Sequence, residues 1–376
     1  MRVSLINSVC RARDAIGEAV HETWRAIVAR PDWECRLFTM QSEFPEIGSK
    51  RARRIADLVT DSWFVSSDVH LYHFGIYWEP MNCLAAGSER TKRVVRFHNV
   101  TPKEFAPPSA HALIEKSIEQ IAVLDFADQL WADSPYNARD LVRAGISADK
   151  IVVDPLFAKP RFAFESLAAK PGGRAELLFV GRFVPSKGVL DLLSAVERLR
   201  ASGAGPFHLS LVGALRSSDA AYVRQVKRAI AARGLRDLVT FVGELDEGEL
   251  AQAYSRAHVV VLPSYHEGFC VPLIEAMHAK AIPVAYEAGN MPDLIAGMGP
   301  IVPVGDIEAL AQALRALIDW LPEFWAGSGA GPPIGEGRRS GIGEYEERVR
   351  AHVAQFTLDE FHARIVRRLS ALTGSS

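Results

Sequence analysis

Two glutamates, Glu267 and Glu275, mark the segment of this chain that is best equipped for chemistry. A short apolar, β-branched run, Ala257–Pro263, precedes them and is typical of a buried parallel strand. A loop then opens into a helical segment, so backbone N–H groups at the helix start can bind an anion. The carboxylates suit sugar hydroxyls, and the amides suit phosphate oxygens. The amides in question belong to Gly268, Phe269, Cys270 and Val271.

This segment resembles the donor site of family 4 retaining glycosyltransferases, which have the GT-B fold. The resemblance rests on the Glu-x7-Glu pair followed by Ala276 and Met277. It extends to 177–188, where an Arg and a Lys follow a strand and open a helix, and to 282–295 downstream. It covers residues 175–315 well and the N-terminal half loosely.

The resemblance implies a role for each glutamate. Glu275 is similar to the residue that holds the ribose hydroxyls of the nucleotide, and Glu267 to the one beside the transferred sugar. The alternative is a pair of carboxylates stabilised only by the helix dipole. That alternative explains Glu275 poorly, because an apolar helix follows it and a buried carboxylate without partners is costly.

Arg182 and Lys187 are the candidate cations for the leaving group. A departing nucleoside diphosphate develops negative charge that must be stabilised. The sequence contains no Asp-x-Asp element to hold a metal, so we expect a metal-independent site that uses these cations instead. Arg182 offers a planar fork and Lys187 a point charge. Taken alone, they could equally be ordinary surface cations.

The N-terminal half contributes a candidate histidine. His98 follows the strand-like Arg93–Phe97 and resembles the family histidine that contacts the transferred sugar. Its surroundings, Arg-Phe-His-Asn-Val-Thr-Pro, are similar to those in bacterial surface-polysaccharide members. Asn99 and His73 are assigned to the acceptor. The competing interpretation is structural, above all for His73, which lies within an apolar run beside Phe74.

Three positions depart from the family pattern. Only one glycine, Gly17, stands where the family has a Gly-Gly loop, Cys270 replaces the second glycine of Gly-Phe-Gly, and Asp293 replaces a Glu. Because only Gly17 remains of the Gly-Gly loop, the sequence gives weaker support to a backbone contact between the N-terminal half and the diphosphate. Gly213 and Val242, at the carboxyl ends of two further expected strands, complete the donor-site assignment.

The composition is that of a soluble globular protein. The chain has 376 residues, 48% hydrophobic and 23% charged, with a formal net charge of −2, which gives no electrostatic support to nucleic-acid binding. The four cysteines form no Cys-x-x-Cys pair. Their scatter argues against a zinc site or disulfide framework and favours a reducing, cytoplasmic setting.

Neither a signal peptide nor a membrane-spanning run is expected from the sequence. Peripheral contact with the cytoplasmic face of a membrane remains open. A basic cluster, Arg51, Arg53 and Arg54, lies near Trp63 and Phe64, although a solvated helix face is the simpler interpretation of such a cluster.

Short apolar strands alternate with helical stretches along the chain, which predicts two Rossmann-like, doubly wound parallel-sheet domains facing an interdomain cleft. We expect an acceptor-side domain over 1–160 and a donor-binding domain over 161–345. A Gly/Pro-rich loop is expected at 325–343, and a final helix at about 346–370 that packs back onto the first domain. A further helix is expected at 110–126.

The resulting hypothesis is a retaining transferase that moves a hexose from a nucleotide diphosphate sugar, without a cofactor. GDP-mannose is the first guess for the donor and a UDP-hexose the second. The acceptor is expected to be a saccharide or lipid-linked saccharide of a bacterial envelope. A GT-B epimerase, a phosphorylase and a non-catalytic sugar-nucleotide binding protein remain alternatives. A NAD-dependent oxidoreductase is disfavoured, because no Gly-x-Gly-x-x-Gly follows the first strand.

Overall fold

The computed structural model describes the chain except residues 13, 87–89, 160–165, 336–339 and 375–376. It divides into two compact units, one of Met1–Phe157 with Leu358–Ser376 and one of Ala158–Thr357. The domain boundary predicted between 160 and 161 lies outside the described residues. Each unit is described by itself.

The first unit is built on a seven-stranded sheet in the order β5-β3-β1-β6-β7-β8-β9, with every neighbouring pair parallel. Strand β6 is buried along its whole length, as expected for a central parallel strand covered on both faces. The strands are β1 (Arg2–Ile6), β3 (Glu34–Thr39), β5 (Lys50–Arg51), β6 (Val69–Phe74), β7 (Lys92–Phe97), β8 (Gln129–Ala132) and β9 (Ile151–Val153).

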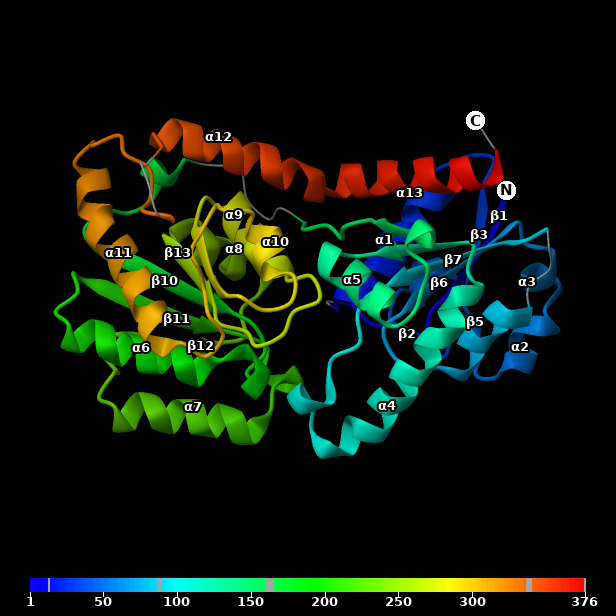
Figure 1. Ribbon diagram of the computed structural model, residues 1–376, viewed down its shortest axis with the longest axis horizontal. Coiled ribbons are helices and arrows are strands. Elements are labelled where there is room, and N and C mark those ends of the chain that lie inside the picture. Colours follow the sequence, from blue (N-terminus) through cyan, green and yellow to red (C-terminus); the bar gives the residue numbers. More distant parts are fainter. Residues whose placement is uncertain (13, 87–89, 160–165, 336–339, 375–376) are drawn as a thin grey trace. The chain divides into compact units, whose positions relative to one another are not determined.

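Helices cover both faces of this sheet (Figure 1). The first and last helices of the chain, α1 and α13, pack against each other on one face. The helices are α1 (Ala15–Val28), α2 (Ile55–Val59), α3 (Ser62–Ser66), α4 (His111–Gln120), α5 (Pro135–Arg143) and α13 (Leu358–Thr373). Helix α5 begins with Ser134 capping the amide of Asn137 and with Pro135 in the first turn.

The second unit has a six-stranded parallel sheet in the order β12-β11-β10-β13-β14-β15. Strands β13 and β14 are fully buried. The strands are β10 (Ala175–Val180), β11 (Phe207–Val212), β12 (Val239–Gly243), β13 (Val259–Leu262), β14 (Ile282–Tyr286) and β15 (Ile301–Val302).

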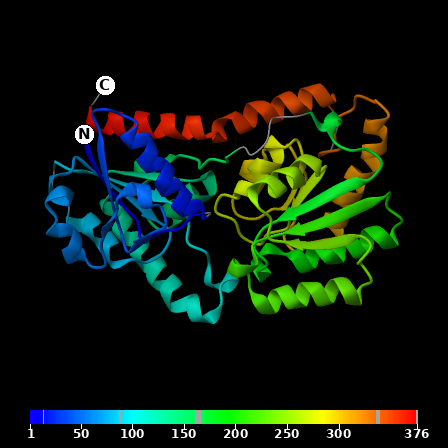
Figure 2. The ribbon, with the colours of Figure 1, turned by 180° about the vertical axis from the view of Figure 1, so that it is seen from behind.

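Helices of the second unit also form two layers. α6, α7 and α11 lie together on one face of the sheet, and α9, α10 and α12 pack together on the other (Figures 1 and 2). The helices are α6 (Val189–Ala201), α7 (Ala220–Ala232), α8 (Glu247–Arg256), α9 (Val271–His278), α10 (Met291–Ile295), α11 (Ile307–Trp325) and α12 (Ile342–Val353). Two parallel-sheet α/β units confirm the predicted fold class.

The single C-terminal helix predicted at about 346–370 is wrong. The structure has two helices, α12 in the second unit and α13 in the first, separated by a short turn that ends at an extended Thr357. Thr357 stands three residues before Glu360, which is the spacing of a helix-start capping box. The helical periodicity hid this signal.

Two further boundaries differ from the prediction. The segment expected to be a loop at 325–343 is shorter, because α11 runs to Trp325 and α12 begins at Ile342. The apolar face of α11, which includes Trp320 and Phe324, continues past Pro322 and keeps this end of the helix buried. The helix expected at 110–126 is α4 followed by a tighter 3₁₀ turn, Ile121–Phe126.

The basic cluster is exposed, but its aromatic neighbours are not free. Phe64 is buried in the core of the first unit, and the guanidinium groups of Arg2 and Arg36 lie 5.1 and 4.4 Å from the ring centre of Trp63. Among the described residues, no helix combines the length and the apolar character needed to cross a bilayer. Peripheral membrane contact stays a prediction.

Candidate functional site

The strand order of the second unit reverses at β10. Strand β11 pairs with one edge of β10 and β13 with the other, although β13 comes three strands later in the chain. The loops after β10 and β13 therefore lie side by side at the carboxyl edge of the sheet. In open α/β sheets, this switch point is where ligands bind.

The predicted donor residues Lys187 and Glu267 meet at this edge. Lys187 lies in a 3₁₀ turn after β10, and its ammonium forms an ion pair with the Glu267 carboxylate on the loop after β13. A backbone hydrogen bond of 2.8 Å from Tyr265 N to Ser186 O joins the same two loops. The pairing holds a cation and a carboxylate at the edge of the sheet.

Two glycines allow these loops to approach the neighbouring backbone. Gly188 (φ 64°) and Gly289 (φ 57°) have left-handed conformations, and an added Cβ would lie 2.0 Å from Pro263 O and 2.1 Å from Glu267 O, respectively. The amide of Asn290 donates to that Glu267 oxygen at 3.0 Å. Only glycine fits such positions, so the backbone that carries Glu267 is fixed from both sides.

Helix α9 begins immediately after this loop. Its N-cap residue, Cys270, has φ 77°, in the left-handed region that favours glycine, and burial raises the pKa of its thiol well above the usual value. The predicted anion-binding segment, Gly268–Val271, thus leads directly into the positive end of a helix. Phe269 is 7% exposed, and its ring packs edge-on against Phe356.

Glu275 lies inside α9 and is 7% exposed. The hydroxyl of Tyr254, on α8, donates to its carboxylate at 2.8 Å. The sequence argument that a buried Glu275 needs partners is therefore met in part by protein. A hydrogen bond from a hydroxyl fixes the orientation of the carboxylate without neutralising its charge.

Arg182 is exposed just after β10, and its guanidinium makes no hydrogen bond or ion pair with the part of the chain that the structure describes. Gly213, after β11, is a close-packing position, because an added Cβ would lie 1.9 Å from Gly181 O. Val242 is 40% exposed on the edge strand β12. Arg182 is therefore not engaged by the described part of the chain, whereas Gly213 is required by packing.

Sequence reasoning missed a tyrosine pair beneath the Lys187 loop. Asp191, in the first turn of α6, accepts hydrogen bonds from Tyr265 at 2.6 Å and Tyr286 at 2.9 Å. Burial, followed by the hydrogen bond to Asp191, raises the pKa of Tyr265 to about 12. The sequence does place both tyrosines at or just after the carboxyl ends of strands. Their contact with Asp191 on α6 cannot be predicted from the spacing of the residues in the sequence.

In the first unit, His98 lies just past the end of β7 and its ring is engaged on both sides. Its Nδ1 is 2.6 Å from Asp133 Oδ2, and its Nε2 is 2.8 Å from Nδ1 of His73. The Asp133 carboxylate can only accept, so His98 Nδ1 carries a proton. Burial, then the neighbouring His98, lowers the pKa of His73 well below its usual value, so His73 is neutral.

This geometry revises how the two histidines work. The His98 side chain is only 1% exposed, and with both nitrogens occupied its ring has no free nitrogen for a sugar in this arrangement. His73, assigned from sequence to the acceptor, contacts His98 instead. Its Nε2 is buried without a hydrogen-bond partner among the described residues.

A fully buried arginine lies behind Asp133. Arg96 donates to Asp133 at 3.0 Å and also pairs with Asp154. Asp154 in turn accepts from Arg364 at 3.2 Å and Arg368 at 2.9 Å, both on α13. Arg96 is a charged residue inside an apolar strand, which is a sequence sign of a buried ion pair. This conclusion was not drawn from the sequence.

The remaining N-terminal predictions have structural explanations. Asn99 (φ 80°) is buried, and its amide donates to Asn137 at 3.0 Å and Asp140 at 3.3 Å. The amide of Gly17 donates to the Asp14 cap at 3.2 Å, and an added Cβ would lie 2.0 Å from Arg11 O. Asn99 is therefore used in holding its own loop, and Gly17 in holding the start of α1 against the preceding segment.

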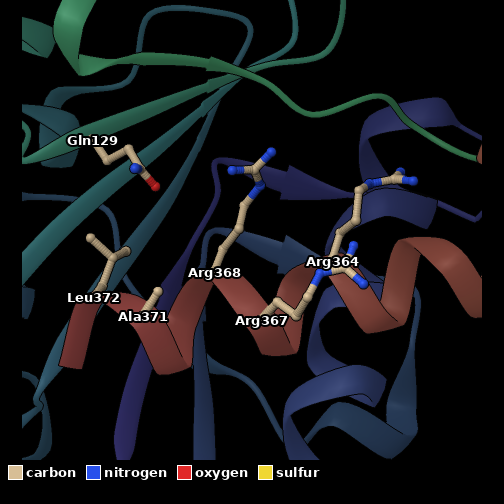
Figure 3. A pocket seen from close by; sticks show the side chains of 6 residues that line it. All are labelled: Gln129, Arg364, Arg367, Arg368, Ala371 and Leu372. Carbon is tan, nitrogen blue, oxygen red and sulfur yellow. The ribbon is translucent and has the colours of Figure 1, made fainter. Parts of the chain in front are cut away.

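A pocket of about 370 Å³ opens beside the last turns of α13 (Figure 3). Arg364 and Arg368 are already used by Asp154, and Arg367 pairs with Glu360 at 2.9 Å. We therefore assign no ligand to it. Its lining is Gln129, Arg364, Arg367, Arg368, Ala371 and Leu372.

Residues 163–320 match the family model described as glycosyl transferases group 1. The O-antigen chain mannosyltransferase B of Escherichia coli is 26% identical over 258 residues, 65% of each protein. The aligned region covers 49% and 32% of two further curated glycosyltransferases, so the chain matches less than two thirds of the length of these relatives.

Solved structures show the fold. Sucrose-phosphate synthase from Thermosynechococcus elongatus superposes with a TM-score of 0.72 at 21% identity, over 100% of both chains. Anabaena HepE in complex with UDP gives 0.73 at 15% identity, over 99% of this chain and 100% of that one. The chain thus has the GT-B fold, and residues 163–320 are similar to the glycosyl transferases group 1 family.

Proposed function

We propose that the protein is a retaining glycosyltransferase that transfers a hexose from a nucleotide diphosphate sugar to a saccharide or lipid-linked saccharide of a bacterial envelope. The observation that carries the proposal is the meeting of Lys187 and Glu267 at the strand-order switch, next to the N-terminus of α9. A cation, a carboxylate and helix amides are the groups that a sugar diphosphate requires.

Each donor-site residue then has a distinct task. Arg182 and Lys187 neutralise the diphosphate, and the amides at the start of α9 bind its oxygens. Glu275, oriented by Tyr254, accepts hydrogen bonds from the ribose hydroxyls. Glu267 accepts from hydroxyls of the transferred sugar once the phosphate takes over Lys187.

The reaction follows from these contacts. The bond between the anomeric carbon and the phosphate oxygen breaks, and its electron pair goes to the phosphate. The acceptor oxygen bonds to the same face of that carbon, and its proton passes to the departing phosphate oxygen. Fixed cations supply the charge stabilisation, so we propose that catalysis needs neither metal nor cofactor.

GDP-mannose is the first candidate for the donor and a UDP-hexose the second. The relative from Escherichia coli is named a mannosyltransferase, which favours mannose. HepE is solved with UDP, which supports the second candidate. In the first unit, Asp133 and His73 engage both ring nitrogens of His98, and Asn99 is held by Asn137. These residues are therefore proposed to support the acceptor side of the protein rather than to contact the transferred sugar.

A thermal-shift screen with UDP, GDP, ADP, TDP and CDP, without added metal, tests the donor site. A ligand that binds only the native state raises the melting temperature by mass action. One diphosphate should stabilise the protein, and the same shift should persist in EDTA. If none of them shifts the melting temperature at millimolar concentration, the donor-site assignment fails. Formation of a new glycoside then separates a transferase from an epimerase, which needs no acceptor.

A further inference from the structure

We propose that α1 and α13 of the first unit form a binding site for a late first-row divalent cation of the zinc type. The ligands are Glu18, His21 and Glu22 on α1 and His362 on α13. This inference is independent of the proposed transferase activity. The two helices pack against each other (Figure 2).

The spacing of the ligands fits one ion. Glu18, His21 and Glu22 offer ligand atoms that all lie within 4.8 Å of one another. The Nε2 atom of His362 lies 3.0 Å from Glu22 Oε2. Zinc bonds of about 2.0–2.2 Å place the ligand atoms of a tetrahedral site about 3.4 Å apart, so binding requires the cluster to contract by roughly an ångström.

The hydrogen bonding of the His21 ring supports the metal site separately from the spacing of the ligands. Its Nε2 lies 2.9 Å from Glu46 Oε1, so Nε2 is the donor nitrogen in the neutral ring. Its Nδ1 then carries a lone pair, and that atom is buried without a hydrogen-bond partner among the described residues. A carboxylate that holds the far nitrogen of a histidine is the usual second layer of a metal site.

The buried Nδ1 atom of His21 faces the carboxylate of Glu22. His21 Nδ1 is 3.9 Å from Glu22 Oε1, and the Glu22 side chain is 0% exposed. Two acceptors facing each other in a buried position repel unless a cation separates them. A hydrogen bond from a protonated Nδ1 does not resolve this, because 3.9 Å exceeds hydrogen-bond distance.

Carboxylates outnumber cations around Glu18, His21, Glu22 and His362, so a divalent cation would be electrostatically favourable there. Among the described residues, three carboxylates, those of Glu18, Glu22 and Glu46, surround two histidines, and Arg25 contacts Glu22. Arg25 Nη1 contacts the Glu22 oxygens at 3.3 and 3.4 Å, which are long distances for an ion pair, and its side chain is 52% exposed. It can turn into solvent when an ion binds.

The ligand types select the ion. Two imidazoles and two carboxylates suit Zn²⁺ and its neighbours, whereas Mg²⁺ and Ca²⁺ prefer oxygen ligands alone. His362 must present the lone pair of Nε2 and carry its proton on Nδ1. Because the ligands come from both ends of the chain, the bound ion would fasten α13 to α1.

The test is a zinc titration of the full chain, stripped with EDTA and followed in competition with a chromophoric chelator. His21→Gln and His362→Gln should each weaken Zn²⁺ binding at least tenfold. His208→Gln, a matched histidine change on β11 of the second unit, should leave it unchanged. Glu46→Gln keeps all four ligands and should weaken binding about 10–100-fold.

A second readout separates the ion from a proton. In imidazole ¹⁵N spectra, Zn²⁺ should shift the Nδ1 resonance of His21. Equal zinc affinity in wild type and His21→Gln overturns the proposal, as does a His21 Nδ1 resonance that Zn²⁺ leaves unchanged. Melting temperatures in EDTA check folding, and if His362→Gln does not fold, His21→Gln decides.

Discussion

Lys187 and Glu267 form an ion pair although 80 positions separate them in the chain. Their side chains are 18% and 13% exposed, so the charges are partly shielded from water and still reachable by a ligand. In the proposed donor complex, a phosphate would replace the Glu267 carboxylate as the anionic partner of Lys187.

This exchange predicts opposite effects for the two partners. Lys187→Met should weaken binding of the stabilising nucleoside diphosphate about 10- to 100-fold, the range for a lost charged hydrogen bond. Glu267→Gln should leave that affinity unchanged or raise it, because the competing carboxylate is gone. Isothermal titration calorimetry measures both, and Lys227→Met on α7 is the matched control. Weaker diphosphate binding in Glu267→Gln would contradict the exchange.

Arg182 makes a separate prediction, because it is exposed and makes no ion pair with described residues. Arg182→Ala should lower kcat/KM by about 10²–10³-fold if its guanidinium stabilises the departing diphosphate. It should cost little stability, since the side chain supports no other group. Arg228→Ala, an equally exposed arginine on α7, is the control. Turnover close to wild type would remove Arg182 from the mechanism.

The sequence predicted the elements that position the donor site because their patterns are local. The apolar run at β13 and the strand at β10 need only period and composition to be recognised. Glu267, Lys187 and Arg182 were then placed by rule at strand ends. The contact between Lys187 and Glu267 follows from β13 pairing with β10, which is a property of the sheet order.

What sequence reasoning missed depends on partners far apart in the chain. The Asp191 carboxylate joins Tyr265 and Tyr286 across three elements. Arg96, 0% exposed, is neutralised by Asp133 and Asp154. A periodicity argument assigns such a charge to solvent, because only the fold reveals its acid partners. The break between α12 and α13 was missed for the opposite reason, since the capping-box spacing of Thr357 and Glu360 is a local signal that helical periodicity outweighed.

Gly289 predicts a local stability effect that a matched glycine can isolate. Gly289→Ala must place a Cβ 2.1 Å from Glu267 O, whereas Gly203→Ala meets nothing within 4 Å, and both have positive φ angles. Gly203→Ala should therefore cost only about 1–2 kcal/mol for the left-handed backbone. Gly289→Ala should cost more and also weaken diphosphate binding, because the backbone from Glu267 into the amides at the start of α9 has to move.

Urea denaturation and calorimetry of the two variants decide this. Similar free energies of unfolding for Gly289→Ala and Gly203→Ala would mean that the loop relaxes freely. In that case the fixed position of Glu267 would not depend on Gly289. Gly203 lies just after α6, outside the predicted site, so its variant should retain wild-type affinity for the diphosphate.

His70 predicts a loss of stability in mild acid. Burial lowers its pKa from 6.5 to about 4, and its Nε2–H donates to Phe64 O at 2.7 Å while its ring stacks on that of Phe64. Between pH 6.5 and 4 the unfolded chain binds a proton that the native state does not. The free energy of unfolding therefore falls as pH falls through this window, by about 3 kcal/mol from this group.

Urea denaturation between pH 7 and pH 4.5 measures this dependence. His70→Gln cannot titrate, so it should be less stable at pH 7 but lose less stability on acidification than wild type. Burial also lowers the pKa of His258 to about 4, so a residual slope should remain in the variant. His111→Gln, at a histidine on α4, should keep the wild-type slope. An unchanged slope in His70→Gln would contradict the lowered pKa of His70 in the native state.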